Sequence, residues 1–140
     1  MILLAFDYGT KNIGVAIGES FIQTSRTLDC ISRKKNNHWL KIKKIISEWE
    51  PLKIILGLPL NIHGKNQKTT LKTRKFSMKL FKKFHIPIHL QDERFTTQEA
   101  KSVLFNKYGK KKLNVKNINS TSALIILRSW LYQNTYKNKK

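Results

Sequence analysis

Three apolar segments near the start of the chain predict three strands joined by short turns. The segments "LLAF" (residues 3–6) and "IGVAIG" (residues 13–18) flank the sequence "DYGTKN", which is rich in turn-forming residues. Aspartate, glycine and asparagine favour tight turns, whereas β-branched residues favour strands. The segment 21–30 is predicted to form the third strand. Since short turns join antiparallel neighbours, these three segments predict an antiparallel meander.

The following residues alternate between helical and strand patterns. Apolar residues recur at intervals of three and four between positions 39 and 49, which predicts a helix that Pro51 ends. The wholly apolar segment at 53–60 is typical of a strand buried on both faces of a parallel sheet. The later predicted elements are a helix at 69–84, a strand at 86–91, a helix from Thr96 or Thr97 to Tyr108, a basic loop at 109–117 and a last helix at 122–133.

This order of elements predicts an α/β domain of ribonuclease H-like type. Its mixed β-sheet would combine a three-strand antiparallel meander with parallel strands, and helices would flank it. A chain of 140 residues can bury a core without disulfides, so a single domain is expected over residues 1–136, with a basic tail at 137–140. In such folds ligands bind at the carboxyl ends of strands.

Charge distinguishes this chain more than any other feature of its composition. Its formal net charge is +20, and Glu99 is the last acidic residue in the sequence. Such a field attracts polyanions, of which nucleic acid is the commonest in the cytosol. A genome rich in A and T offers another explanation for the abundance of lysine. No apolar run approaches the length of a membrane span, and the lone Cys30 fits a reducing compartment, so a cytoplasmic protein is expected.

Three of the few acidic residues stand at the predicted ends of strands. Asp7 follows the first strand, and Asp92 and Glu93 follow the strand at 86–91. Carboxylates on neighbouring strands can hold two Mg²⁺ or Mn²⁺ ions for phosphodiester hydrolysis. Because adjacent strand residues point to opposite faces, we expect Glu93 to be the metal ligand and Asp92 a supporting group. The alternative is that these acids only cap turns and the following helix.

The turn "DYGTKNIG" also permits a second interpretation. Acidic turns of this kind, followed by glycine and threonine, hold nucleotide phosphates in actin-like and sugar-kinase ATPases. Those proteins close two domains over the nucleotide, and this chain offers one. In either interpretation, Gly9, Thr10 and Lys11 are predicted to lie close to a phosphate or to support the carboxylates. Arg94 is predicted to have a similar role: it could pair with an acid or reach the scissile phosphate.

Four motifs taken together resemble the YqgF family of small bacterial ribonuclease H-like proteins. They are "LLAFDYGTKNIGVAIG", "IILGLPLNIHG", "DERFTTQEA" and "NSTSALIIL", in this order and over nearly the whole chain. Members of the family are described as Holliday junction resolvases and as pre-16S rRNA nucleases that trim the 5′ end of small-subunit rRNA. The resemblance implies an Mg²⁺- or Mn²⁺-dependent nuclease whose metal site contains Asp7 and Glu93.

The third metal ligand of the family is an aspartate, and Asn119 occupies the matching position here. An amide oxygen can bind Mg²⁺ but carries no charge. One interpretation keeps catalysis, with Asn119 as third ligand. The other leaves a catalytically weakened RNA-binding or ribosome-assembly factor, and a nuclease of branched DNA is a third alternative. The implied partners are the rRNA precursor and the ribosomal particle, and the protein would be a monomer or a weak homodimer.

A lysine-rich segment precedes Asn119 and is predicted to hold nucleic acid. Its lysines would contact phosphates on both sides of the cut, and its tyrosine would stack on an unpaired base. A solvated loop is the alternative interpretation. The residues are Lys107, Tyr108, Lys110, Lys111, Lys112 and Lys116.

Overall fold

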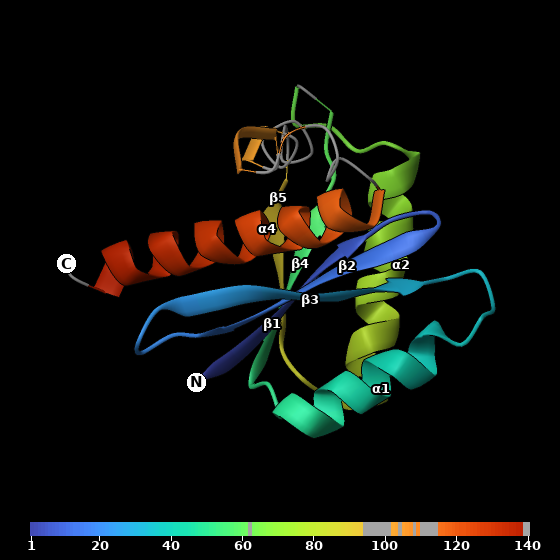
Figure 1. Ribbon diagram of the computed structural model, residues 1–140. Coiled ribbons are helices and arrows are strands. Elements are labelled where there is room, and N and C mark those ends of the chain that lie inside the picture. Colours follow the sequence, from blue (N-terminus) through green and yellow to red (C-terminus); the bar gives the residue numbers. More distant parts are fainter. Residues whose placement is uncertain (62, 94–101, 104, 108, 110–114, 139–140) are drawn as a thin grey trace.

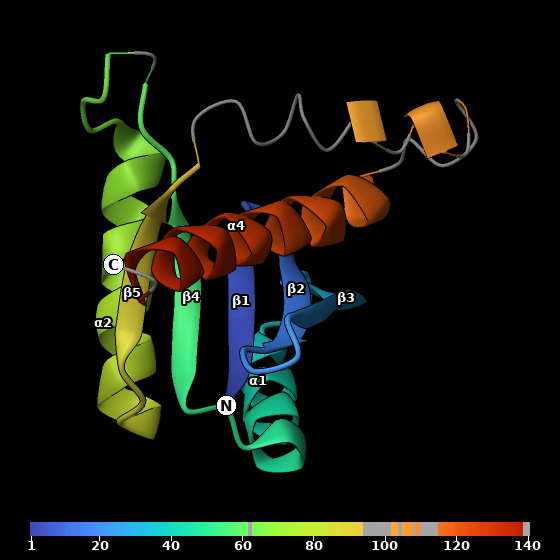
Figure 2. The same cartoon turned by 90° about the vertical axis from the view of Figure 1, so that its left-hand side faces the viewer.

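The computed structural model contains one five-stranded sheet with helices on both faces (Figures 1 and 2). It describes residues 1–61, 63–93, 102–103, 105–107, 109 and 115–138. The strands are β1 (Ile2–Tyr8), β2 (Asn12–Glu19), β3 (Thr24–Ser32), β4 (Lys53–Leu58) and β5 (Ile88–Asp92). The helices are α1 (His38–Trp49), α2 (Lys68–Phe84) and α4 (Val115–Asn138).

The sheet has the order β3-β2-β1-β4-β5. Its first three strands pair antiparallel, whereas β4 runs parallel to both β1 and β5. This arrangement is the predicted antiparallel meander extended by parallel strands, and it confirms the predicted fold class. The carboxyl ends of β1, β4 and β5 therefore lie at the same edge of the sheet.

Alternation along the strands divides the core into two layers. On one face α4 packs on Leu3, Ala5 and Ala16, through residues such as Ala123 and Leu127. On the other face α1 and α2 pack on the alternate strand residues; buried members of that layer are Leu4, Phe6, Val15, Ile42, Phe76 and Leu80. Figures 1 and 2 show α4 crossing the strands on one side, with α1 and α2 on the other.

Helix α1 ends where Pro51 predicts. Glu50 adopts the left-handed conformation, and its N–H donates to the Ile46 carbonyl at 2.9 Å. Such a cap satisfies one of the last carbonyls of the helix. Helix α2 begins with a capping box between Gln67 and Thr70, which satisfies two backbone groups at its start.

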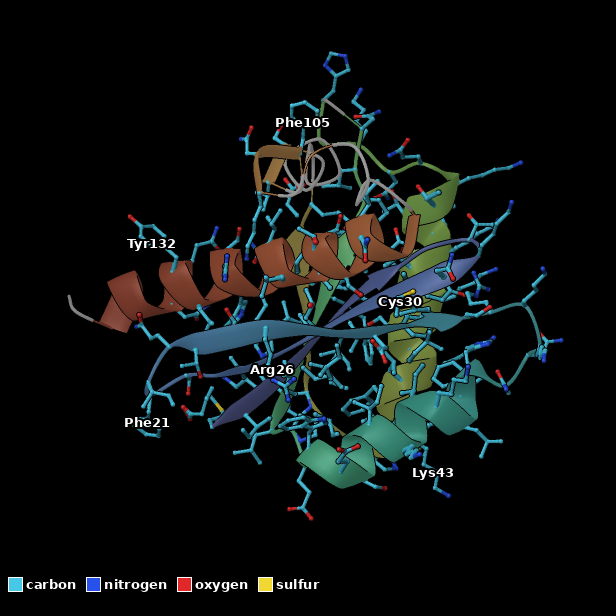
Figure 3. The ribbon with its side chains drawn as sticks, viewed as in Figure 1. Phe21, Arg26, Cys30, Lys43, Phe105 and Tyr132 are labelled. Carbon is cyan, nitrogen blue, oxygen red and sulfur yellow. The ribbon has the colours of Figure 1, made fainter. Side chains whose placement is uncertain are left out.

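The largest boundary errors are at the start of β3 and at both ends of α4. Strand β3 starts at Thr24, because Phe21 and Ile22 form the exposed β2–β3 turn (Figure 3 labels Phe21 there). Helix α4 begins at Val115, within the segment predicted as a basic loop, and it continues to Asn138, into the predicted tail. The helix predicted from Thr96 or Thr97 to Tyr108 lies mostly outside the described residues. Of the helices that the structure describes, none is apolar enough over a sufficient length to span a bilayer.

Candidate active site

Asp7 lies near the carboxyl end of β1 and continues the row of Leu3 and Ala5 on the face that α4 covers. It pairs with Gly14 of β2. On the other side, Gly57 of β4 comes one residue after the Phe6–Leu56 pair, so it lies beside Asp7. The two neighbours of Asp7 therefore have no side chains, which leaves space over the sheet at this point.

Glu93 occupies the space over Gly57. A Cβ atom at position 57 would lie 2.5 Å from Glu93 Oε2 and 2.4 Å from Ile126 Cδ1, so a larger residue there would displace both side chains from this space. The Glu93 N–H donates to the Leu58 carbonyl at 3.2 Å, which extends the β4–β5 pairing by one residue. The side chains of Glu93 and Asp7 are hydrogen-bonded to each other. Thus the structure brings together two acids that the sequence places far apart.

The two carboxyl groups hold on to protons more strongly than usual. Burial raises the pKa of Asp7 to about 6, although its hydrogen bond with Glu93 lowers it in part. Burial, followed by the nearby charge of Asp7 and the shared hydrogen bond, raises the pKa of Glu93 to about 9. Like charges at hydrogen-bond distance cannot both ionise easily. At neutral pH the pair therefore shares one proton, and this proton must leave before a cation can bind both groups.

Asn119 lies in the second turn of α4 and passes directly over Gly14. A Cβ atom at position 14 would lie 1.9 Å from the Asn119 carbonyl oxygen, and one at Gly9 would lie 3.8 Å from Asn119 Nδ2. The neighbouring Ser120 hydroxyl donates to the Leu28 carbonyl of β3 at 2.9 Å. Because Gly14 pairs with Asp7, this close approach places the Asn119 backbone over the strand neighbour of Asp7.

The donor set suits a hard divalent cation. Two carboxyl groups and one side-chain amide would offer oxygen ligands of the kind that Mg²⁺ and Mn²⁺ prefer. Within the described ranges no group of three acidic, histidine or cysteine side chains converges, so the third position differs from an all-carboxylate site. Asn119 can supply an oxygen there but no negative charge.

The predicted supporting residues differ in their surroundings. The Gly9 N–H donates to the Asn12 carbonyl at 2.9 Å and closes the β1–β2 turn, which exposes Thr10 and Lys11. Asp92 is exposed at the end of β5, while Glu93 is half-buried, as expected from strand alternation. Arg94 lies outside the described residues.

Most of the predicted nucleic-acid segment also lies outside the described residues: Tyr108, Lys110, Lys111 and Lys112 belong to this group. Lys107 is exposed on helical backbone. The backbone of Lys116 is in the first turn of α4, which corrects its predicted place in a loop. Its side chain is not described.

Two features of the site were missed in the sequence. Gly57 interrupts an otherwise apolar strand, and a glycine in that setting is a signal of close approach by another group. Arg33 donates through Nη1 to the carbonyls of Gly9 and Thr10 at 2.8 and 3.1 Å, which fixes the turn after Asp7. No local pattern could reveal this contact, because Arg33 belongs to a different part of the chain.

Solved structures with the same architecture define the fold. Thermus thermophilus RuvC in complex with a Holliday junction substrate matches with a TM-score of 0.60 at 10% identity, over 96% of each chain. A second structure of that RuvC matches with a TM-score of 0.57 at 8% identity, also over 96% of each chain. At such identities the likeness concerns the fold, which is of the RuvC type in the ribonuclease H-like class.

Sequence comparison identifies the family within that class. The family model RuvX, described as Holliday junction resolvase, matches residues 1–133, and the chain belongs to this family. The predicted resemblance to the YqgF family, which is the same family, is confirmed. Two relatives named "Putative pre-16S rRNA nuclease" illustrate the similarity. The one from Wigglesworthia glossinidia brevipalpis is 53% identical over 93% of this chain and 91% of its own length. The one from Buchnera aphidicola subsp. Schizaphis graminum is 47% identical over 97% of this chain and 100% of its own length.

Proposed function

We propose that this protein is a divalent-metal-dependent nuclease that processes the 5′ end of the small-subunit rRNA precursor. The observation that carries the proposal is the half-buried, hydrogen-bonded pair of Asp7 and Glu93 at the carboxyl edge of the sheet, where the Asn119 backbone passes over Gly14. Relatives at 53% and 47% identity carry the corresponding name. The net charge of +20 suits a polyanionic substrate.

Asp7, Glu93 and Asn119 would hold the Mg²⁺ or Mn²⁺. When bound, such ions activate a water molecule and stabilise the charge on the leaving oxygen of a phosphodiester. Asp7 sits on a central strand and Glu93 is packed over Gly57, so their oxygens are held in place before substrate arrives. This rigidity saves reorganisation during the reaction. The proton shared by the two carboxyl groups leaves as the site is loaded.

The neutral Asn119 makes the site less negative than one with three carboxylates. This favours a substrate that brings its own negative charge, since phosphate oxygens complete the coordination of such ions. It also supports a second candidate function, in which the protein binds precursor rRNA or the ribosomal particle in the cytoplasm without cutting efficiently.

Cleavage assays with matched variants test the proposal. The substrate is the 5′ region of precursor 16S rRNA with Mn²⁺, and a four-way DNA junction is run in parallel. We expect Asp7→Asn to abolish cleavage, because it removes a ligand charge and a hydrogen-bond acceptor at the site. We expect Asn119→Asp to increase cleavage at low Mn²⁺, because it adds a charged ligand.

Glu48→Gln is the matched control, since it removes one exposed carboxylate from α1, far from the sheet edge. It should cleave like the wild type. Equal cleavage by all variants would overturn the assignment of the site. If the wild type binds RNA without cutting it and the Asn119→Asp variant does cut it, the assembly-factor function would be supported. Faster cutting of the DNA junction than of the RNA would favour DNA as the substrate.

A further inference from the structure

A strongly basic pocket lies on the face of the sheet opposite to Asp7. Its volume is about 420 Å³, and the β1–β2 turn, α1 and α2 surround it. We call it the basic pocket. Its basic and imidazole lining residues are Arg33, His38, Lys72, Lys75 and Lys79.

The charges in the basic pocket are not balanced by acids. Its described lining contains five basic or imidazole side chains and no carboxylate. Lys72, Lys75 and Lys79 follow one another at spacings of three and four along α2, so they lie on one helix face. Like charges at these spacings repel and destabilise a helix. A bound anion would relieve this repulsion.

Arg33 is held rigidly in the wall of the basic pocket. Its Nη1 donates to the Gly9 and Thr10 carbonyls, and its guanidinium carbon lies 4.4 Å from the centre of the Tyr8 ring. The other face of Tyr8 stacks on Phe76, with ring centres 4.1 Å apart. A guanidinium fixed in this way is suited to binding phosphate, because little side-chain freedom is lost on contact.

Two side-chain nitrogens in this wall are buried with no hydrogen-bond partner in the part of the chain that the structure describes. Neither Arg33 Nε nor His38 Nδ1 makes a hydrogen bond to any described residue. Buried polar atoms normally have partners, so each such atom requires an explanation. Arg33 and Lys79 both act on His38 electrostatically, which shows that cations from different elements converge here. An oxyanion is the ligand class that would balance the positive charge of the basic pocket.

The basic pocket and the candidate active site share the end of β1. Tyr8 and Gly9 line the pocket, and Asp7, the preceding residue, faces the other side of the sheet. A strand of RNA lying across this edge would therefore reach both. Resting on the proposed function, we propose that the basic pocket binds one backbone phosphate of the substrate strand next to the phosphodiester that is cut. It would set the position of the cut rather than perform the chemistry.

RNA binding without metal tests this inference independently of cleavage. A short labelled single-stranded RNA is titrated in EDTA, and anisotropy is followed over about 50–200 mM salt. The pocket variant is Lys72→Gln/Lys75→Gln/Lys79→Gln. Because the three replaced lysines are exposed on α2, the variant is expected to fold. The control variant is Lys41→Gln/Lys43→Gln/Lys44→Gln, which removes the same charge from exposed positions on α1 (Figure 3 shows Lys43 on its outer side).

We expect the pocket variant to lose about tenfold in affinity, and its salt slope to become shallower by about 0.7, the value for one phosphate contact on a single strand. The control variant should lose affinity only through its lower net charge, by a few-fold at most. Equal losses in the two variants would overturn the inference. If the wild type does not cleave RNA but the pocket variant still loses more RNA affinity than the control variant, only the proposed function is refuted. If the wild type cleaves RNA and the two variants lose equal affinity, only the role of the basic pocket is refuted.

Binding of small phosphate compounds tests whether the ligand of the basic pocket is a backbone phosphate or a free nucleotide. Inorganic phosphate should shift the NMR signals of the Gly9 and Thr10 amides and of the His38 ring in the wild type and the control variant, but not in the pocket variant. A nucleoside monophosphate should bind about as tightly as inorganic phosphate, because both faces of Tyr8 are already covered. A nucleotide that binds more than about tenfold tighter, which is about 1.4 kcal/mol, would overturn the backbone assignment.

Discussion

The shared proton of Asp7 and Glu93 should make the protein less stable as pH rises. In the unfolded chain both groups ionise near their ordinary values of 3.8 and 4.5. In the folded protein the pKa of Asp7 is raised to about 6 and that of Glu93 to about 9. Between pH 6 and 8 the folded state therefore binds one more proton than the unfolded state. The stabilising contribution is complete at low pH and is lost as pH rises through the folded pKa values.

The size of the effect follows from one proton. A difference of one bound proton lowers the free energy of unfolding by about 1.4 kcal/mol per pH unit. Both side chains are half-buried rather than sealed from water, and solvent reduces the shift. We therefore expect a loss of about 2 kcal/mol between pH 6 and 8, which corresponds to about 7 °C in Tm for a chain of this size.

Urea denaturation at each pH measures this loss, and Asp7→Asn/Glu93→Gln provides the reference. The double variant keeps the shape of both side chains and has nothing to titrate at this position. It shares His38 and His89, whose pKa values are lowered mainly by burial, so their contribution cancels in the comparison. The wild type should be less stable than the double variant at pH 8, and the gap should close toward pH 5.

A divalent cation should reverse the trend. Because both carboxyl groups must lose their protons to bind it, Mg²⁺ should stabilise the wild type more at pH 8 than at pH 6. The double variant should gain little at either pH. If the stability of the wild type and of the double variant changed with pH in the same way, both with and without Mg²⁺, the claim that these two carboxyl groups share a proton would be refuted.

Two further predictions concern packing around the site. Gly14→Ala should lower the free energy of unfolding, measured by chemical denaturation, by about 3 kcal/mol, the upper range for overpacking. The reason is that the new Cβ would lie 1.9 Å from the Asn119 carbonyl oxygen. A loss below about 0.5 kcal/mol would contradict the close approach of α4. Leu127→Ala should also cost about 3 kcal/mol, since Leu127 is fully buried between α4 and the sheet, yet it should leave the metal dependence of cleavage unchanged. A change in that dependence would show that α4 packing and the site are coupled more widely.

Local patterns in the sequence are sufficient for the elements and their order. The alternation within 3–18 and the spacing of three and four between 39 and 49 appear again as β1, β2 and α1. Short turns require antiparallel neighbours, and an apolar strand between helices requires a parallel sheet, so the mixed sheet could also be predicted. Asp7 and Glu93 could be selected because they are rare acids at the ends of strands.

The start of α4 shows where local patterns are insufficient. Residues 115–117 belong to the segment that the sequence predicts as a basic loop, but they are helical. The following turn of α4 is held to the sheet, because the Asn119 backbone lies against Gly14 and the Ser120 hydroxyl donates to β3. Such tertiary contacts commonly override local propensity.

Local patterns are enough to predict the strands, most of the helices and the acids that could meet. That Asp7 and Glu93 do meet depends on packing: Gly14 and Gly57 lie on either side of Asp7, and the space above them admits the Asn119 backbone and Glu93. This division arises because period and propensity act over a few neighbouring residues. The register between strands and the approach of a helix depend on contacts between segments far apart in the chain.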